Sequence, residues 1–427
     1  MKKSNQKPGP GRDMSRRNFL KAGSLATVFG LSGAVEIKAA PAVHTRRADE
    51  PVRAALIGFG QWGREIAATM GRIPEYQLVA VADTYDVMLR RVQRSVPGAS
   101  THTDYREVLD NPEVQAVFIA TPTHQHKDVA LAALQAGKHV YVEAPLAASI
   151  DDARAMAVAA KGTPKQIFQV GHLYRSNPQH RSIFQFIRSG AIGTPAMVRA
   201  QHHMKESWRR ASPNREREVE QNWRLDPAVS IGLVGELGVH QFDTAGWFLQ
   251  TRPVAVTGFG QVRSWNDGRT MPDTVQAVIE LSNGANMLYD ATLASSFDDE
   301  YDMFYGSDST IMLRDSKAWM FKEVDAPMLG WEVYARKDRF YRENGIALVA
   351  NATQLDAQAA EPWEDDPNVE TPLFYALKEF VDNMNFGPYE PSASYRVGYE
   401  NAVIGVKAHE AVMNQQRVTI DDGMFEL

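Results

Sequence analysis

The chain contains no cysteine among its 427 residues. This absence excludes disulfide bonds, cysteine nucleophiles, thiolate zinc sites and iron–sulfur clusters. The chain also has no excess of basic residues, because 46 Lys and Arg stand against 52 Asp and Glu and the formal net charge is −6. A general nucleic-acid-binding protein gains most of its affinity from Lys and Arg that neutralise phosphates, so no nucleic-acid partner is expected. The length is typical of two or three domains with an ample core.

The basic residues are concentrated at the N-terminus. Residues 1–42 carry a net charge of +6, so the remainder carries −12. They include the run Ser15-Arg16-Arg17-Asn18-Phe19-Leu20-Lys21, an apolar stretch at 22–35 and the small residues Ala40-Pro41-Ala42. A basic leader, a short apolar run and an A-x-A site are typical of an export signal. The run with paired arginines resembles the twin-arginine (Tat) consensus at every fixed position.

We therefore expect residues 1–42 to be a Tat signal peptide that is cleaved near residue 42, with the Tat export machinery as a partner. A basic amphipathic helix is the alternative. The apolar run of 14 residues is shorter than the ~20 that span a bilayer, and no other run reaches that length. The mature protein is thus expected to have no membrane span and to be periplasmic or otherwise exported. Tat systems carry folded proteins, commonly with a cofactor bound.

A glycine-rich turn follows the first apolar run beyond the signal. Residues 52–57 predict a buried strand that leads into Gly58-Phe59-Gly60-Gln61-Trp62-Gly63, a helix, and a second strand at 78–82 that ends at Asp83. This order is the dinucleotide-binding fingerprint. Gly58 permits the tight turn, Gly60 lets the pyrophosphate approach the backbone, and Gly63 lets helix and strand pack closely. Asp83 would accept hydrogen bonds from the adenosine ribose and repel a 2′-phosphate, which favours NAD over NADP.

Two more strand–loop units follow this fingerprint. The strand predicted at 114–120 leads into Thr121-Pro122-Thr123-His124-Gln125-His126, and the strand predicted at 138–142 leads into Glu143-Ala144-Pro145. A helix is predicted between them. Repeated alternation of strand and helix predicts an α/β fold with a doubly wound parallel sheet. His124 and His126 are metal ligands by residue type, but their place after a strand favours loop packing, and no metal is expected.

These landmarks, together with Arg188-Ser189-Gly190-Ala191-Ile192-Gly193-Thr194-Pro195, resemble those of the Gfo/Idh/MocA oxidoreductases in order and spacing. The resemblance covers nearly all of the chain after the signal. It implies a Rossmann domain at 43–172 that binds NAD, and a C-terminal α/β domain at 173–427 with an open, mostly antiparallel sheet. That second domain shapes the substrate site and supports a homo-oligomer. The implied cofactor contacts are Gly58, Phe59, Gly60, Gln61, Trp62, Gly63, Asp83, Thr121, Pro122, His124, His126, Glu143, Ala144 and Pro145.

The second domain also has a pattern of its own. Helices are predicted at 178–189 and 394–414. Apolar runs with short turns between several of them predict an antiparallel sheet. Residues 324–371 look long and irregular, and a lid, an insertion and a surface excursion are all open. The predicted strands are 196–203, 253–262, 274–281, 286–293, 301–305 and 310–313.

Glu236 and His240 are the candidate catalytic pair. They stand four residues apart, so on one helix their side chains point from the same face. A carboxylate can position an imidazole, and a neutral histidine can accept a hydroxyl proton as hydride leaves the same carbon. The run 232–243 resembles the family's G-G-x-x-x-D-x-G-x-H-x-x-D motif, which implies the acid/base place for His240 and puts Glu236 where Asp is usual. Asp243 is expected to orient its neighbours, and a buried histidine with no catalytic role is the alternative.

One position departs from the family pattern. The family's Glu-Lys-Pro has a lysine that contacts substrate and cofactor ribose, and here that position is Ala144. Another cation, from Lys205, Arg175 or Arg209, is one explanation. A second is chemistry with a transient hydride, as in the superfamily's NAD-dependent glycosidases, which also lack this lysine and oxidise C3, eliminate the aglycone, add water and return the hydride. A third is sugar binding without catalysis.

Export favours a cofactor that stays bound to the protein and is recycled there, because no useful pool of free NAD exists outside the cytoplasm. We expect an exported NAD-dependent oxidoreductase that acts on a sugar or sugar derivative with a tightly bound, recycled cofactor. A redox-neutral NAD-dependent glycoside hydrolase is the first alternative and a non-catalytic sugar-binding protein the second. Tryptophan can stack on a sugar face and arginine can fork hydrogen bonds to its hydroxyls. The expected substrate contacts are Tyr174, Arg175, Trp223 and Arg224.

Overall fold

The computed structural model describes residues 50–314, 317–340, 343–348 and 370–427. The predicted signal peptide, residues 1–42, lies outside these ranges, as do residues 349–369 of the segment that looked irregular. Within the described ranges, none of the helices has the length and apolarity needed to cross a bilayer.

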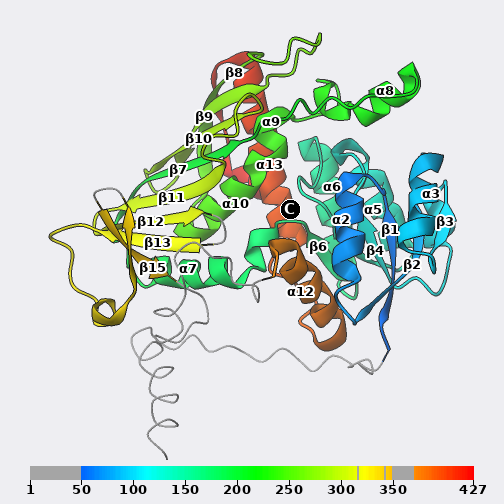
Figure 1. Ribbon diagram of the computed structural model, residues 1–427, viewed down its shortest axis with the longest axis horizontal. Coiled ribbons are helices and arrows are strands. Elements are labelled where there is room, and N and C mark those ends of the chain that lie inside the picture. Colours follow the sequence, from blue (N-terminus) through cyan, green and yellow to red (C-terminus); the bar gives the residue numbers. More distant parts are fainter. Residues whose placement is uncertain (1–49, 315–316, 341–342, 349–369) are drawn as a thin grey trace, which may run out of the picture. The chain divides into compact units, whose positions relative to one another are not determined.

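The first sheet is parallel and has six strands in the order β3-β2-β1-β4-β5-β6. The order reverses direction between β1 and β4, which is the arrangement of a doubly wound dinucleotide-binding sheet. Its central strands are buried because helices lie along the sheet (Figure 1). The elements are β1 (Val52–Ile57), α2 (Gln61–Met70), β2 (Tyr76–Ala82), α3 (Asp86–Ser95), β3 (Ser100–His102), α4 (Tyr105–Leu109), β4 (Ala116–Ile119), α5 (His126–Gln135), β5 (His139–Val142), α6 (Ile150–Gly162) and β6 (Phe168–Val170).

A helix from far along the chain completes the core of this first sheet. In Figure 1, α12 (Pro372–Phe386, orange) lies beside α2. Its Phe380 ring packs edge-on against Phe118 of β4 at 5.3 Å between ring centroids. The Tyr76 hydroxyl donates to the Leu377 carbonyl oxygen at 2.7 Å. The core around the first sheet therefore includes residues beyond the predicted range 43–172.

The second sheet has ten strands in the order β14-β15-β13-β12-β11-β7-β10-β9-β8-β16. The β7–β10 pair is parallel, whereas the remaining pairs are antiparallel. The strands are β7 (Pro195–His203), β8 (Pro253–Gln261), β9 (Thr274–Leu281), β10 (Asn286–Thr292), β11 (Glu300–Gly306), β12 (Ser309–Arg314), β13 (Lys317–Lys322), β14 (Lys337–Phe340), β15 (Glu343–Leu348) and β16 (Arg417–Thr419). Together the two sheets confirm the predicted fold class.

Helices cover one face of this second sheet (Figure 1). Phe248 of α10 packs on Phe304 of β11 with ring centroids 5.1 Å apart. A Cβ on Gly258 of β8 would lie 2.6 Å from the Val412 side chain of α13, so glycine permits this close approach. The helices of this part of the chain are α7 (Pro178–Arg188), α8 (Arg215–Gln221), α9 (Gly232–Glu236), α10 (Gly238–Leu249) and α13 (Tyr395–Asn414).

The expectation that residues 324–371 are irregular is partly wrong. Strands β14 and β15 lie within this range and extend the second sheet at one edge. Trp319 of β13 donates from Nε1 to Asp338 of β14 at 2.8 Å, which fastens the added strands. Sequence periodicity missed them because β14 reads Lys-Asp-Arg-Phe, with little apolar alternation.

Candidate active site

The glycine-rich turn has the geometry that a dinucleotide requires. Gly58 has a φ of +95°, and a Cβ there would lie 2.6 Å from the Ala120 carbonyl oxygen. A Cβ on Gly63 would lie 2.0 Å from the Gly58 carbonyl oxygen, so the turn and α2 can pack only with glycine at both positions. Gly60, in contrast, faces open space with no atom within 4 Å of an added Cβ. This opening lies at the N-terminus of α2, where free N–H groups favour an anion such as pyrophosphate.

Asp83 holds the turn in place from the end of β2. Its carboxylate accepts hydrogen bonds from the backbone N–H of Phe59 at 2.7 Å and of Tyr85 at 2.8 Å. A carboxylate can accept about four hydrogen bonds in all, so two acceptor positions remain for the hydroxyls of an adenosine ribose. Asp83 therefore links the strand end to the turn and still fits the predicted ribose contact.

The loop after β4 carries the two histidines of the Thr121–His126 run. The ring nitrogens of buried His126 lie 3.0 to 3.2 Å from the carbonyl oxygens of Thr121, Pro145 and Leu146, and burial lowers the His126 pKa to about 4. His126 thus ties this loop to the loop after β5, which is loop packing. His124 contacts the Trp223 ring at 5.9 Å between centroids. No group of three or more possible metal ligands occurs in the described ranges.

Glu143, before Ala144 and Pro145, is a buried carboxyl group at the end of β5. It is 8% exposed, and burial raises its pKa to about 8. A Cβ on neighbouring Gly171 would lie 2.6 Å from a Glu143 carboxyl oxygen, so the backbone directly after β6 lies close against this side chain. Neutral Glu143 can therefore persist at pH 7 in this position.

Glu236 connects the second domain to the loop after β4. Its Oε2 accepts a hydrogen bond from the Thr123 hydroxyl at 3.1 Å, whereas its Oε1 is buried without a hydrogen-bond partner. Burial raises the Glu236 pKa to about 7, and the nearby charge of Arg224 partly opposes this rise. A buried acceptor with a free oxygen, at the loop where the parallel strands end, is suited to receive a proton from a bound hydroxyl.

The structure corrects the predicted pairing of Glu236 with His240 on one helix. Glu236 ends α9 and His240 lies in α10, with Leu237 between the two helices. Within the described residues, no hydrogen bond joins the two side chains. The helix breaks at Leu237, so α9 spans only five residues, and Gly235 and Gly238 around this break pack closely against the side chains of Ile231 and Phe242.

His240 instead belongs to a group of rings with His172 and Tyr174, which lie in the segment after β6. Its ring lies 5.8 Å from His172 and 6.5 Å from Tyr174 between centroids. Burial, followed by the neighbouring His172, lowers the His240 pKa to about 3. His240 is therefore a neutral imidazole at pH 7, which can donate one hydrogen bond and accept another.

Arg175, predicted to contact substrate or replace the missing lysine, is committed to a buried ion pair. Its Nε and Nη2 donate to both carboxylate oxygens of Asp243 at 2.8 to 3.0 Å. Asn401 of α13 donates to the same carboxylate at 2.7 Å. Asp243 thus has the orienting role that was expected, and it joins the segment after β6 to α10 and α13.

The other two candidates for the missing cation also have different partners. Lys205 lies over the Trp265 ring at 5.1 Å and donates to Ser264 at 3.3 Å. Arg209 pairs with Asp267 and Glu218, each at 2.8 Å. Arg224 is the cation whose charge acts on Glu236, and its guanidinium carbon lies 4.6 Å from the Trp223 ring centroid and 5.5 Å from that of Trp208.

A cavity of about 190 Å³ opens beside Tyr174. The Tyr174 hydroxyl donates to Glu300 of β11 at 2.8 Å, and Glu300 lies 3.4 Å from Nδ1 of His202 on β7. His203, the next residue of that strand, pairs instead with Asp290 of β10. His202 and His203 thus have different partners, as their alternation on a strand predicts.

Sequence reasoning did not single out several residues of this site. Glu300 was missed because its place opposite His202 follows from strand register, which no local pattern reveals. Thr123 stood in the Thr121–His126 run, but its contact with Glu236 joins residues 113 positions apart. His172 belongs to none of the sequence motifs, and its buried ring comes to lie beside His240 only through tertiary packing.

Family comparisons agree with this geometry. The model of the oxidoreductase family with an NAD-binding Rossmann fold matches residues 52–172, and the GFO/IDH/MocA C-terminal domain model matches residues 180–312. The chain belongs to the Gfo/Idh/MocA oxidoreductase family. Its first domain has the NAD-binding fold of this family, and NAD is its cofactor.

Individual relatives of the Gfo/Idh/MocA family match over part of the chain. The 1-carboxy-3-chloro-3,4-dihydroxycyclohexa-1,5-diene dehydrogenase of Comamonas testosteroni is 29% identical over 240 residues, which is 56% of this chain and 57% of that protein. The scyllo-inositol 2-dehydrogenase (NAD(+)) of Bacillus subtilis is 28% identical over 244 residues, 56% of this chain and 66% of that protein. The chain thus spans less than two thirds of the length of these curated relatives.

Solved structures show the same fold. An oxidoreductase domain protein from Kribbella flavida superposes with a TM-score of 0.71 at 21% identity, covering 87% of this chain and 100% of that chain. A levoglucosan dehydrogenase in complex with NADH and L-sorbose has a TM-score of 0.68 at 20% identity, covering 87% of this chain and 99% of that one. At these identities the likeness concerns the fold alone.

Proposed function

We propose that this protein oxidises a hydroxyl group of a sugar or polyol, with NAD as the acceptor. The observation that carries the proposal is Glu236, a buried carboxyl with one unpartnered oxygen, held by Thr123 at the loop where the strands of the NAD-binding sheet end. Bound NAD supplies the chemistry of accepting hydride from the substrate carbon. The chain must then accept the hydroxyl proton and hold the substrate.

In this proposal Glu236 receives the proton. A proton acceptor works best when its pKa lies near the operating pH. The Glu236 pKa of about 7 meets this condition, whereas the His240 pKa of about 3 makes that imidazole a weak base. His240 then orients the substrate hydroxyl as a neutral hydrogen-bonding group.

A polyhydroxylated substrate fits the residues around His240. Tyr174 and Glu300 line one cavity, and His202 lies 3.4 Å from Glu300, so these side chains supply hydrogen-bond donors and acceptors there. The aromatic faces of Trp208 and Trp223 lie against Arg224, whose charge acts on Glu236, and such faces stack on sugar rings. The names of relatives support this class, because they include inositol 2-dehydrogenases, a levoglucosan dehydrogenase and a 1,5-anhydro-D-fructose reductase.

We further propose that the enzyme is exported and keeps its cofactor bound. The basis is the paired-arginine run in residues 1–42, together with the scarcity of free NAD outside the cytoplasm. A second substrate must then return the cofactor to its oxidised form before the next cycle. A fusion of residues 1–42 to a reporter that is active only after folding in the cytoplasm should reach the periplasm, and Arg16→Lys together with Arg17→Lys should abolish export.

The test of the main proposal is single-turnover mixing of NAD-loaded protein with sugars and polyols, followed by NADH absorbance. Glu236→Gln should lower the rate by roughly 10²–10⁴-fold, the range of general acid–base catalysis, and remove the rise of rate with pH near 7. Glu323→Gln, at an exposed glutamate that directly follows β13, is the matched control and should leave the rate unchanged. A Glu236→Gln rate within twofold of the native rate would contradict the assignment.

A redox-neutral glycoside hydrolase is the second candidate, and Ala144 is the observation that favours it. The family's lysine is absent there, and Lys205, Arg175 and Arg209 all have other partners. Under this alternative, nitrophenyl glycosides are cleaved with no net NADH, and His240→Ala or Glu236→Gln abolishes cleavage. If sugars raise the melting temperature but give neither NADH nor cleavage, the protein is a non-catalytic binder.

A further inference from the structure

Residues 205–226 form a segment that we call the strap, because it leaves the second domain and reaches the NAD-binding turn. It follows β7, contains α8, and ends shortly before α9. The family comparison and the proposed chemistry give the strap no role beyond Trp208, Trp223 and Arg224. Several of its other charged residues, among them Arg209, Arg210 and Arg217, form ion pairs with acidic side chains.

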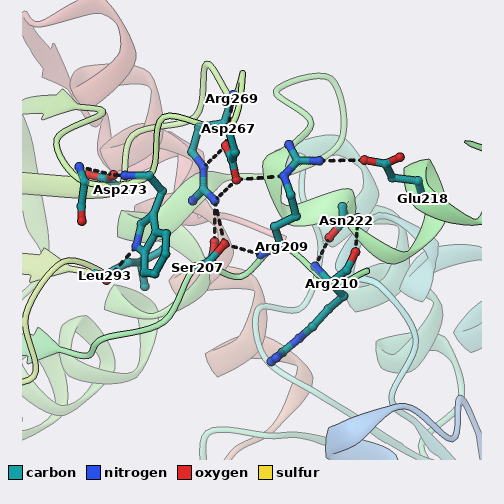
Figure 2. A network of polar contacts seen from close by, with 11 residues as sticks. Ser207, Arg209, Arg210, Glu218, Asn222, Asp267, Arg269, Asp273 and Leu293 are labelled. Atoms are coloured by element: carbon teal, nitrogen blue, oxygen red, sulfur yellow. Dashed lines mark hydrogen bonds and ion pairs between the residues drawn. The ribbon is translucent and has the colours of Figure 1, made fainter. Parts of the chain in front are cut away.

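One end of the strap is fixed to the second domain by a network of arginines and acids. The Arg269 side chain is 1% exposed and donates to the Ser207 carbonyl oxygen at 2.7 Å. Arg209 pairs with both Asp267 and Glu218, each at 2.8 Å (Figure 2). Because Glu218 lies in α8, Arg209 joins this fixed end of the strap to α8. The neighbouring loop is itself held, because Asp273 accepts from three backbone N–H groups, of residues 263, 264 and 265.

The backbone of Arg210 is clamped by Asn222. The Arg210 N–H donates to Asn222 Oδ1 at 2.6 Å, and Asn222 Nδ2 donates back to the Arg210 carbonyl oxygen at 3.0 Å. Asn222 is itself buried, at 7% exposure. Figure 2 shows the Arg210 side chain pointing away from the network, and this fixed backbone determines where that side chain can reach.

Two arginines of the strap contact the NAD-binding domain at separate points. Arg210 Nη2 donates to Oε1 of Gln61, the first residue of α2, at 3.1 Å. The Arg217 guanidinium carbon of α8 lies 4.4 Å from the ring centroid of Tyr85, whose N–H donates to Asp83. The first contact is at the turn that takes the pyrophosphate and the second is beside the acid that takes the adenosine ribose.

The charge at the first contact suits a phosphate. The first turn of α2 has no acidic residue and its N-cap makes no side-chain hydrogen bond, so the free backbone N–H groups of this helix end are available to an anion. Nη2 of Arg210 is shared between Gln61 and the Glu206 carboxylate, whereas Nε and Nη1 have no hydrogen-bond partner among the described residues. Glu206 thus holds the guanidinium without using all of its donors, and the N–H groups of Nε and Nη1 can still donate to phosphate oxygens.

We propose that Arg210 is a phosphate-binding residue for NAD contributed by the second domain, and that the strap retains the cofactor by spanning from the pyrophosphate turn to the ribose end. Because NAD lies between these two anchor points, its release requires the Arg210 and Arg217 contacts to open. The inference rests on the proposed function in one respect, since a retained cofactor is what internal recycling needs.

The test measures NADH release directly and uses no sugar. Native protein is loaded with NADH and mixed with excess NAD, and the loss of NADH fluorescence gives the dissociation rate constant. A hydrogen-bonded charge contributes about 1.5–3 kcal/mol, so Arg210→Gln should speed release by roughly ten- to a hundredfold. Arg217→Gln should speed release by a smaller factor, because its contact is a cation–π interaction. Release from native protein should also quicken as salt is raised.

Arg215→Gln is the matched control, since it makes the same charge change on the exposed side of α8 and lines neither contact. Its release rate should equal that of the native protein. The proposal is overturned if Arg210→Gln releases NADH within twofold of the native rate, or if Arg215→Gln speeds release as much. If the Arg210 variant does not fold, the salt dependence of NADH release from native protein is a sufficient test, and a release rate that does not change with salt overturns the proposal. If the protein oxidises sugars but the variants do not change NADH release, only the proposal for the strap is refuted. If the variants change NADH release but no sugar is oxidised, only the proposed reaction is refuted.

Discussion

Replacing Glu236 with glutamine measures how much the titration of this buried carboxyl group contributes to the free energy of unfolding. Folding raises the Glu236 pKa from its ordinary value of 4.5 to about 7. The folded protein therefore holds a proton that the unfolded chain releases between these two values. The corresponding stability is fully present below pH 4.5 and is lost as pH rises to 7. At about 1.4 kcal/mol for each unit of pKa, the loss above pH 7 is roughly 3 kcal/mol.

Glu236→Gln removes this pH dependence and keeps an oxygen that can accept the Thr123 hydrogen bond. The variant should gain stability relative to the native protein as pH rises from 5 to 8. With an unfolding entropy of about 2.1 cal/mol/K per residue, ~3 kcal/mol corresponds to a relative shift of roughly 3 °C in melting temperature for a chain of this length. Buried Glu143 titrates in both proteins, so its contribution cancels in the difference.

The assay is thermal unfolding at pH 5, 6, 7 and 8 with nucleotide concentration held constant, because bound NAD stabilises the folded state. Glu323→Gln controls for the loss of an exposed carboxylate and should show no pH-dependent difference. A melting-temperature difference between Glu236→Gln and native protein that stays constant from pH 5 to 8 would refute the argument that burial raises this pKa.

Two other predictions address the cofactor and the ion pair. Asp83→Ser should raise the affinity for NADP relative to NAD by about tenfold or more, because the carboxylate that repels a 2′-phosphate is gone; titration of both nucleotides measures this, and an unchanged ratio would count against the ribose contact. Asp243→Ala should lower the free energy of unfolding by about 3–5 kcal/mol, because it leaves Arg175 beside a buried site without its partner; urea unfolding measures this, and a loss below about 1 kcal/mol would show that the pair contributes little.

The nucleotide-binding half was accessible from sequence because its signals are local. The turn from Gly58 to Gly63, the acid at Asp83 and the apolar strands around them lie within a few dozen residues, and each has a backbone or chemical reason. Helix α12 could not be assigned to that half, since its packing on Phe118 joins segments more than 250 residues apart.

The catalytic region was predicted less well because its geometry depends on tertiary contacts. The spacing of Glu236 and His240 identified both residues. The break at Leu237 places them in separate helices, so Glu236 contacts Thr123 whereas His240 contacts His172. The ion pair of Arg175 with Asp243 was not foreseen because residue type predicts a substrate contact as readily as an ion pair. Strand register likewise decides that Glu300 stands opposite His202.

The most direct test of the proposed activity is the amount of NADH formed per subunit when protein with bound NAD meets a panel of sugars, polyols and nitrophenyl glycosides. We predict that at least one sugar or polyol yields NADH up to one equivalent per subunit, that the reaction then stops, and that adding a carbonyl acceptor restarts it. Glycoside cleavage without net NADH, or no NADH with any compound while NAD remains bound, would contradict the proposal.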